Sequence, residues 1–207
     1  MGCWFTKQVC RANRLILVVM SLQSNSDKDK FLADVAFGIA LAGTAQRGKV
    51  YRRESSADER KNFRSALRCA LENLAQQYDA PVTDDRHVSN IDDLARTLSK
   101  QHPEALNASS FRIGSAQKAL NLYLKMLWCF DRIPTPPHCP FDRVVLSRVP
   151  GCESVKWTQL DSLPEYERIV RRARSVSNGV SLADWELHLY TSALSAARVT
   201  SLGADAT

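Results

Sequence analysis

The segment from Phe111 to Arg148 constrains this chain most strongly, because a long apolar helix is followed there by a proline-rich turn. Residues 115–130 contain no proline or glycine, and apolar residues lie on nearly every side of a helix with 3.6 residues per turn. A helix that is apolar almost all round is normally buried. We therefore predict that this helix lies at the centre of the fold.

Polar residues interrupt this apolar helix at four positions, namely Gln117, Lys118, Asn121 and Lys125. They fall on one stripe, because residues three and four apart are neighbours on a helix surface. Burying an unpaired neutral polar group costs on the order of 2–7 kcal/mol. The stripe must therefore face water, a partner or a cleft, and an ordinary solvated face is the simplest of these alternatives.

The segment after the helix contains four of the eight prolines of the chain, Pro134, Pro136, Pro137 and Pro140. Proline fixes φ and biases the preceding residue toward extended geometry, so we predict a stiff, non-helical connector. It presents His138 and Asp142, which face the polar stripe in our hypothesis. A purely structural alternative is that both residues satisfy backbone groups and that Asp142 caps the next element.

The rest of the pattern predicts an all-α fold, a single domain of about six to eight helices with at most one short strand pair. Helix starts are expected at Asp27, Ser56, Asn90, Ser115, Ser162 and Ser181, and residues 81–88 are expected to be a loop. Arg143 to Val149 is the best strand candidate.

Apolar residues recur at helical spacing in the first two of these helices. Phe31, Val35, Ile39 and Ala42 are expected on the core face of the first. The second begins with a capping box, Ser56 to Glu59, and we expect it to run to about Tyr78. Its expected core face consists of Phe63, Leu67, Ala70, Leu71 and Leu74.

Both ends of the chain are expected to lie outside the domain, which we place at residues 20–198. The apolar run from Leu15 to Met20 is too short for a bilayer, which needs about 20 residues, and no clear small-residue cleavage site follows it. We expect Met20 to be the native start, residues 1–19 to be an extension, and residues 199–207 to be a frayed tail. N-terminal sequencing of the native protein tests this expectation.

The net charge of +6 and the pI of about 9.1 favour an acidic partner. Residues 111–148 carry six basic and two acidic residues, so their net charge is +4. We expect nucleic acid, DNA rather than RNA, as the partner, and no membrane. Arg112, Gln117, Asn121, Lys125 and Arg143 are the candidate contact residues, and a protein partner is the alternative.

The six cysteines are scattered and none forms a C-x-x-C pair, which favours free thiols in a reducing compartment and hence a cytoplasmic protein. The spacing of Cys129, His138, Cys139 and Cys152 matches no usual zinc pattern, so we predict no metal site.

A stretch from Gly43 to Lys49 imitates a phosphate-binding loop, G-x-x-x-x-G-K. Val50 stands where Ser or Thr should hold magnesium, and the preceding segment has a helical pattern where a strand is required. A helix stop followed by a basic turn is the simpler interpretation. We therefore predict no nucleotide-binding loop and no cofactor.

The order of features from Phe111 to Leu146 resembles helix-hairpin-helix DNA glycosylases. The corresponding pieces are Ile113-Gly114, Lys118 and Pro140-Phe141-Asp142, about a sixth of the chain. Two departures are that one hairpin glycine is present instead of two, and that Lys118 and Asp142 lie 24 positions apart, further than is usual in the family. Elsewhere the chain resembles bacterial proteins without a known activity, so this second resemblance suggests no function.

The glycosylase resemblance implies base excision, in which a base is flipped out of the duplex. Lys118 would attack the sugar, for which burial must depress its pKa, and Asp142 would stabilise the positive charge that develops there. Arg112, Lys125 and Arg143 would contact phosphates.

Three other functions fit the same residues. A non-catalytic nucleic-acid-binding module needs only the basic face and the amides of Gln117 and Asn121. A protein-interaction module would use Trp128, Trp157 and Trp185 as core or interface anchors. A helical ribonuclease would use Arg132 and His138, spaced R-x5-H as in HEPN-type nucleases, with His138 as a catalytic residue.

Overall fold

The structure is a computed structural model that describes residues 27–46 and 49–192. Within these residues it contains seven α-helices, and an isolated bridge between Tyr51 and Leu106 takes the place of a sheet. The prediction of an all-α fold with six to eight helices is confirmed for this part of the chain. The expectations for residues 1–19, for Met20 and for residues 199–207 lie outside it.

Two compact units are distinguished, one ending at Val35 and the other beginning at Ala36. In the first, residues 27–35 are helical. In the second, the helix continues to residue 41 and is followed by the π-helix η1 (Ala42–Gln46). Phe31 is 65% exposed and Ile39 is 39% exposed, so the prediction that these two residues face the core is wrong.

Small residues decide which side of this segment is buried. Ala36 and Ala40 are fully buried in place of Ile39. The segment approaches α4 so closely at Gly43 that an added Cβ would lie 2.5 Å from Cδ1 of Leu122. A large side chain on the contacting side would prevent this approach, which is why the alanine side is buried.

Helix α2 (Ala57–Ala75) begins at the predicted capping box. The backbone N–H of Ser56 donates to Glu59 at 2.7 Å, and the backbone N–H of Glu59 donates to the Ser56 hydroxyl at 3.2 Å. Phe63, Leu67 and Leu71 are buried as predicted, and the 3-10 turn η2 (Gln76–Tyr78) extends the element to Tyr78.

Helix α3 (Asp84–Gln101) begins six residues before the predicted start, so the expected loop at residues 81–88 and the expected cap at Asn90 are wrong. Thr83 is the N-cap, and its hydroxyl accepts from the backbone N–H of Arg86 at 3.3 Å. Asp84 and Asp85 in the first turn complement the positive end of the helix dipole. Asn90 is buried inside the helix.

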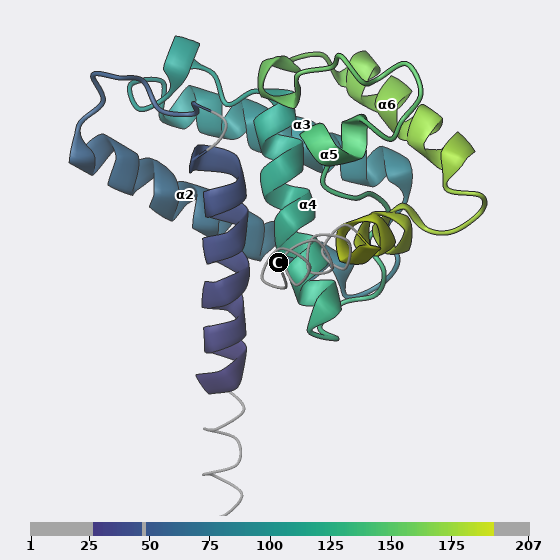
Figure 1. The fold of residues 1–207 in the computed structure, drawn as a ribbon. Coiled ribbons are helices and arrows are strands. Elements are labelled where there is room, and N and C mark those ends of the chain that lie inside the picture. The colour runs from purple at the N-terminus through teal and green to yellow at the C-terminus, as the bar shows by residue number, and fades with distance from the viewer. Residues whose placement is uncertain (1–26, 47–48, 193–207) are drawn as a thin grey trace, which may run out of the picture. The chain divides into compact units, whose positions relative to one another are not determined.

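Helix α4 (Ile113–Cys129) is the predicted central helix. It contacts α2, α3, α6 (Leu163–Val176) and the turns η1 and η4 (Trp157–Gln159), and it runs between the labelled helices in Figure 1. The turn η3 (Asn107–Ser109) precedes it. Gly114 is required at its start, because an added Cβ would lie 1.7 Å from the backbone oxygen of Trp157.

Helix α5 (Arg143–Leu146) is a single turn, so the prediction of a strand at residues 143–149 is wrong. Asp142 caps it, and its Oδ1 accepts from the backbone N–H groups of Val144 at 2.9 Å and Val145 at 3.1 Å. The predicted cap Ser162 begins α6. Residues 182–192 form the last described helix, after the predicted cap Ser181.

A transmembrane span requires a long apolar helix, and the ranges 27–46 and 49–192 contain none.

Candidate functional site

Two buried amides of α4 hold the proline-rich segment against the helix. Gln117 donates to the carbonyl oxygen of Phe141 at 2.9 Å and accepts from its backbone N–H at 3.2 Å. Asn121 donates to the carbonyl oxygen of Cys139 at 2.9 Å. Both side chains are 0% exposed, so the two amides of the polar stripe face the proline-rich segment and not solvent.

A chain of buried hydrogen bonds continues from Asn121 into α3. The Oδ1 atom of Asn121 lies 2.9 Å from Nε2 of His87, and Nδ1 of His87 lies 2.7 Å from the hydroxyl of Tyr78. Asn90 donates to the same hydroxyl at 3.1 Å. Asn121 therefore joins α3 and η2 to the central helix.

The amide of Asn121 also contacts a residue of α6. Nδ2 of Asn121 lies 3.4 Å from the hydroxyl of Tyr166, which lies 2.8 Å from Nδ1 of His138. Nε2 of His138 lies 3.6 Å from Asp84, too far for a direct hydrogen bond, so this last contact is electrostatic. Asp84 accepts two hydrogen bonds from Arg174, at 2.6 and 2.7 Å.

The partners fix the tautomers of both histidines. Because Nδ2 of Asn121 faces the carbonyl oxygens of Gln117 and Cys139, its Oδ1 must be the acceptor for His87. His87 therefore carries its proton on Nε2, and Nδ1 accepts from Tyr78. Tyr166 similarly accepts from Asn121 and donates to His138, whose Nε2–H then points at Asp84.

Burial disfavours the charged form of both rings. Desolvation holds the pKa of His87 well below its usual value, with a contribution from nearby His138, and desolvation also lowers the pKa of His138. Desolvation raises the pKa of Tyr78 to about 12. The network is a neutral, mostly satisfied array, which suits a positioning role and not proton exchange with solvent.

Lys118 and Asp142 form an ion pair beside the buried network. Nζ of Lys118 lies 3.3 Å from Oδ2 of Asp142 and 4.4 Å from the ring centroid of Trp157. Lys118 is 3% exposed, whereas the Asp142 side chain is 27% exposed. The capping bonds to α5 use Oδ1 of Asp142, so Oδ2 is directed to the lysine.

A pocket of about 590 Å³ opens at this pair. Its polar lining also includes Lys125 and Glu186, whose side chains meet at 2.5 Å. Its apolar lining includes Leu122 and Tyr190, and Lys125 lies 4.9 Å from the Tyr190 ring centroid. The pocket therefore combines two lysine–carboxylate pairs with an apolar and aromatic wall.

Glu186 is a carboxyl group of this pocket whose pKa is shifted from its usual value. Desolvation raises its pKa, and this effect exceeds the opposing effect of Lys125. A buried carboxyl group with a raised pKa, lining a pocket, is a candidate general acid or base.

The structure does not bring all of the predicted site residues together. Lys118, Lys125 and Asp142 share the pocket, whereas Gln117, Asn121 and His138 belong to the buried network listed above. Arg143 is exposed on α5, and Arg112 lines a different pocket. Arg132 is exposed, while His138 is only 1% exposed.

Sequence reasoning missed the partners that lie on other helices, notably His87, Tyr166 and Glu186. A signal for Glu186 was present, because it lies four residues after Leu182 and four before Tyr190 on one stripe of the last helix. A lone carboxylate on such a stripe is the same kind of interruption that singled out Lys118.

Within the described residues, no group of three or more His, Cys, Asp or Glu side chains is arranged to hold a metal ion. The cysteines of this part, Cys69, Cys129, Cys139 and Cys152, are free thiols. Comparison of the chain with family models, with curated proteins and with solved structures gives no match.

Proposed function

We propose that this chain binds DNA and excises a base from it, using the pocket at Lys118. The observation that carries the proposal is the 3.3 Å approach of Lys118 to Asp142 in the wall of a 590 Å³ pocket. This volume lies within the range of about 300–1,000 Å³ typical of small-molecule sites. The apolar wall and Tyr190 suit the flat faces of an extruded base.

Lys118 is the nucleophile of the proposed reaction. Its ammonium group first transfers a proton to Asp142, the carboxylate within reach. The neutral amine then attacks C1′ of the sugar, and a C–N bond to Lys118 forms as the bond between C1′ and the base breaks. The base leaves with the bonding electron pair and takes the proton from Asp142, which regains its negative charge beside the cationic sugar.

Release of the sugar follows from the same amine. The sugar ring opens when a proton passes from the lysine nitrogen to the ring oxygen, which leaves a protonated imine at C1′. Water adds to this imine, and hydrolysis frees Lys118 and an abasic sugar. The imine is the species that an experiment can trap.

The resemblance to helix-hairpin-helix glycosylases supports this assignment, because Lys118 and Asp142 are the residues that correspond to the lysine and aspartate of that family. In the proposal, Gln117, Asn121 and His138 are positioning residues, since they are buried and hold the segment that carries Asp142. Exposed Arg143, next to Asp142, is assigned to a DNA phosphate.

Reductive trapping tests the proposal without knowledge of the target base. The protein is incubated with borohydride and a DNA duplex that contains one abasic site, and covalent complexes are separated on a denaturing gel. Wild type should form an adduct, Lys118→Gln should form at most a tenth as much, and Lys100→Gln, which changes an exposed lysine on α3, should match wild type. Equal adduct yields from Lys118→Gln and wild type would contradict the proposal.

Duplexes with uracil, hypoxanthine or oxidised guanine then identify the excised base. Products are cleaved with alkali and resolved on a gel, and Asp142→Asn should slow excision with folding verified by circular dichroism. DNA retention that weakens with salt, without a product on any duplex, favours the non-catalytic nucleic-acid-binding module instead.

The remaining alternatives have weaker support. The low exposure of His138 argues against a ribonuclease that uses it with Arg132. Trp128, Trp157 and Trp185 all pack on or within the core, which leaves less of their surface for a protein interface. We also assign the chain to the cytoplasm, which the free thiols of the described residues support.

A further inference from the structure

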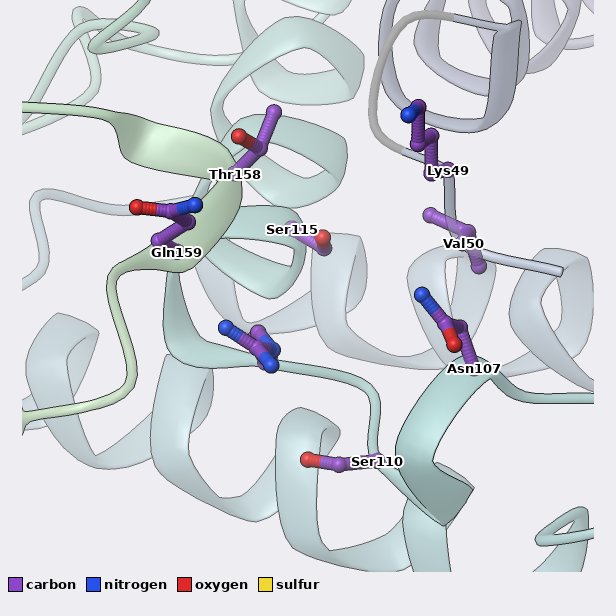
Figure 2. A pocket seen from close by; sticks show the side chains of 8 residues that line it. Lys49, Val50, Asn107, Ser110, Ser115, Thr158 and Gln159 are labelled. Carbon is purple, nitrogen blue, oxygen red and sulfur yellow. The ribbon is translucent and has the colours of Figure 1, made fainter. Parts of the chain in front are cut away.

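A second pocket, of about 290 Å³, lies at the start of α4 (Figure 2). Its lining comes from four segments and includes Lys49, Ser110, Arg112 at the N-cap of α4, Ser115 within α4, and Thr158 of η4. Seven of the eight lining residues are polar, two of these are cationic and none is acidic. Lys118 and Lys125 in the other pocket, by contrast, each face a carboxylate.

The polar side chains of this second pocket are not engaged with one another or with the rest of the described chain. Neither Lys49 nor Arg112 forms an ion pair or side-chain hydrogen bond within residues 27–46 and 49–192. The hydroxyl of Ser115 is also without such a partner there, although Ser115 is only 4% exposed. Its oxygen is not one of the fully enclosed unpaired atoms of the described residues, so it opens into the pocket that it lines, where a ligand oxygen can reach it.

The lining defines the chemistry of the missing partner. A guanidinium, an ammonium and several hydroxyl and amide groups present many hydrogen-bond donors, and no carboxylate competes for them. Arginine and lysine bind phosphate oxygens through charge-assisted hydrogen bonds. A phosphate group offers acceptor oxygens in several directions at once, which matches donors that come from four segments.

We propose that this pocket binds a phosphate group through Arg112, Lys49 and the hydroxyls of Ser115 and Thr158. Lys49 belongs to the G-x-x-x-x-G-K sequence, but a helix and the π-helix η1 precede it instead of a strand. The site is therefore a meeting point of remote segments and not a phosphate-binding loop. It does not rest on the chemistry proposed for Lys118.

Two kinds of ligand carry a phosphate group of this chemistry, namely a nucleic-acid backbone and a free nucleotide. The position of the pocket favours the backbone, because Trp157 lies under Lys118 while the next residue, Thr158, lines the second pocket. Ser115 likewise precedes Lys118 by three residues on α4. A DNA strand that places one of its sugars at Lys118 would bring a neighbouring phosphate of the same strand toward Arg112.

Titration of a charge-matched pair of variants tests the proposal. Lys49→Gln/Arg112→Gln removes the two cations of the pocket, and Lys100→Gln/Arg148→Gln removes two exposed cations elsewhere. Each protein is titrated with inorganic phosphate, with a deoxynucleoside monophosphate and with duplex DNA at several salt concentrations. Arg112 makes no side-chain capping bond, so its replacement should leave α4 intact, which circular dichroism verifies.

We expect the Lys49/Arg112 variant to bind at least one of these ligands about tenfold more weakly than the matched control. Weaker DNA binding with a salt slope reduced by about 0.9 relative to the control identifies one backbone phosphate. A loss confined to the monophosphate or to inorganic phosphate identifies a free ligand. Binding of inorganic phosphate involves no bond breaking, so this measurement succeeds or fails independently of the chemistry proposed for Lys118.

Equal affinities of the two double variants for all three ligands would overturn the proposal. Failure of wild type to bind any of the three would overturn it as well. Ser115→Ala gives a second measurement, because it removes one buried hydroxyl without a change of charge and should weaken binding of the same ligand by a factor of about three to ten.

Discussion

The imidazole of His87 and the amide of Asn121 meet across 34 positions of sequence, with Nε2 of His87 2.9 Å from Oδ1 of Asn121. Both side chains are at most 1% exposed. This contact joins α3 to α4 and orders the amide that also holds Cys139. The position of Asp142 beside Lys118 therefore depends on a buried network that includes neither residue.

Replacement of Asn121 by leucine should destabilise the fold. It leaves the Nε2–H of His87 and the carbonyl oxygen of Cys139 without partners, and each unsatisfied buried group costs about 1–3 kcal/mol. We expect a loss of about 3 kcal/mol in the free energy of unfolding, measured with urea. Asn73→Leu on the exposed side of α2 is the matched control and should change it by less than about 0.5 kcal/mol. Equal effects of both changes would argue against a structural role for the network.

Stability should fall as the pH drops below about 6.5, the value of an unperturbed histidine. Burial lowers the pKa of His87 and His138 in the folded state, so between the two values the unfolded chain binds more protons than the folded chain. Protons then favour unfolding, by up to about 1.4 kcal/mol per pH unit for each histidine. Urea unfolding at pH 8, 7, 6 and 5 measures the slope.

The exposed His188 provides the control for this pH dependence. His188→Gln should leave the slope unchanged, because this exposed ring lies outside the buried network of His87 and His138. A free energy of unfolding that stays constant from pH 8 to pH 5 would contradict the prediction, because it would show that the folded and unfolded chains bind equal numbers of protons over this range.

A methyl group at Gly114 should disrupt the junction between α4 and η4. The added Cβ would lie 1.7 Å from the backbone oxygen of Trp157, and backbone cannot move aside as a flexible side chain can. We expect Gly114→Ala to lower the free energy of unfolding by about 3 kcal/mol or more. Gly38→Ala is the control with the opposite sign, since nothing lies within 4 Å of its Cβ and alanine favours a helix by about 1 kcal/mol. A stable Gly114→Ala variant would contradict the observed packing.

Loss of Glu186 should be costly because it leaves Lys125 without its carboxylate. The two side chains are 9% and 13% exposed, and breaking a buried pair costs about 3–5 kcal/mol. Replacing both partners together with Leu and Met should cost less than the sum of the single changes. A double-mutant cycle in urea measures the coupling, and the exposed Glu165–Arg168 pair, worth less than about 1 kcal/mol, is the comparison. Strict additivity at Glu186 and Lys125 would show that the contact contributes no stability.

Much of the fold could be predicted from residues close in sequence. The capping side chains of Ser56 and Ser162 begin helices where expected. The apolar pattern of residues 115–130 identified α4 as a buried helix. These features depend on contacts within about four positions, and such contacts are present in the sequence itself.

The errors arose where a remote contact outweighed the local pattern. Residues 81–88 were expected to form a loop, yet α3 begins at Asp84, because His87 and Asn90 are buried against Asn121 and Tyr78. Arg143 to Leu146 has the composition of a strand but forms a helical turn, since no neighbouring strand is present in the described residues to pair with it.

The sequence by itself determined that α4 is buried and that its polar stripe needs partners. Only the tertiary structure decided which partners these are, because Asp142, Tyr166 and Glu186 lie 24, 45 and 61 positions from the residues they contact. The physical reason is that a helix's periodicity specifies which side must be covered, whereas the packing of the remaining helices specifies what covers it. The lysine–carboxylate pairs of the pocket are a product of that packing.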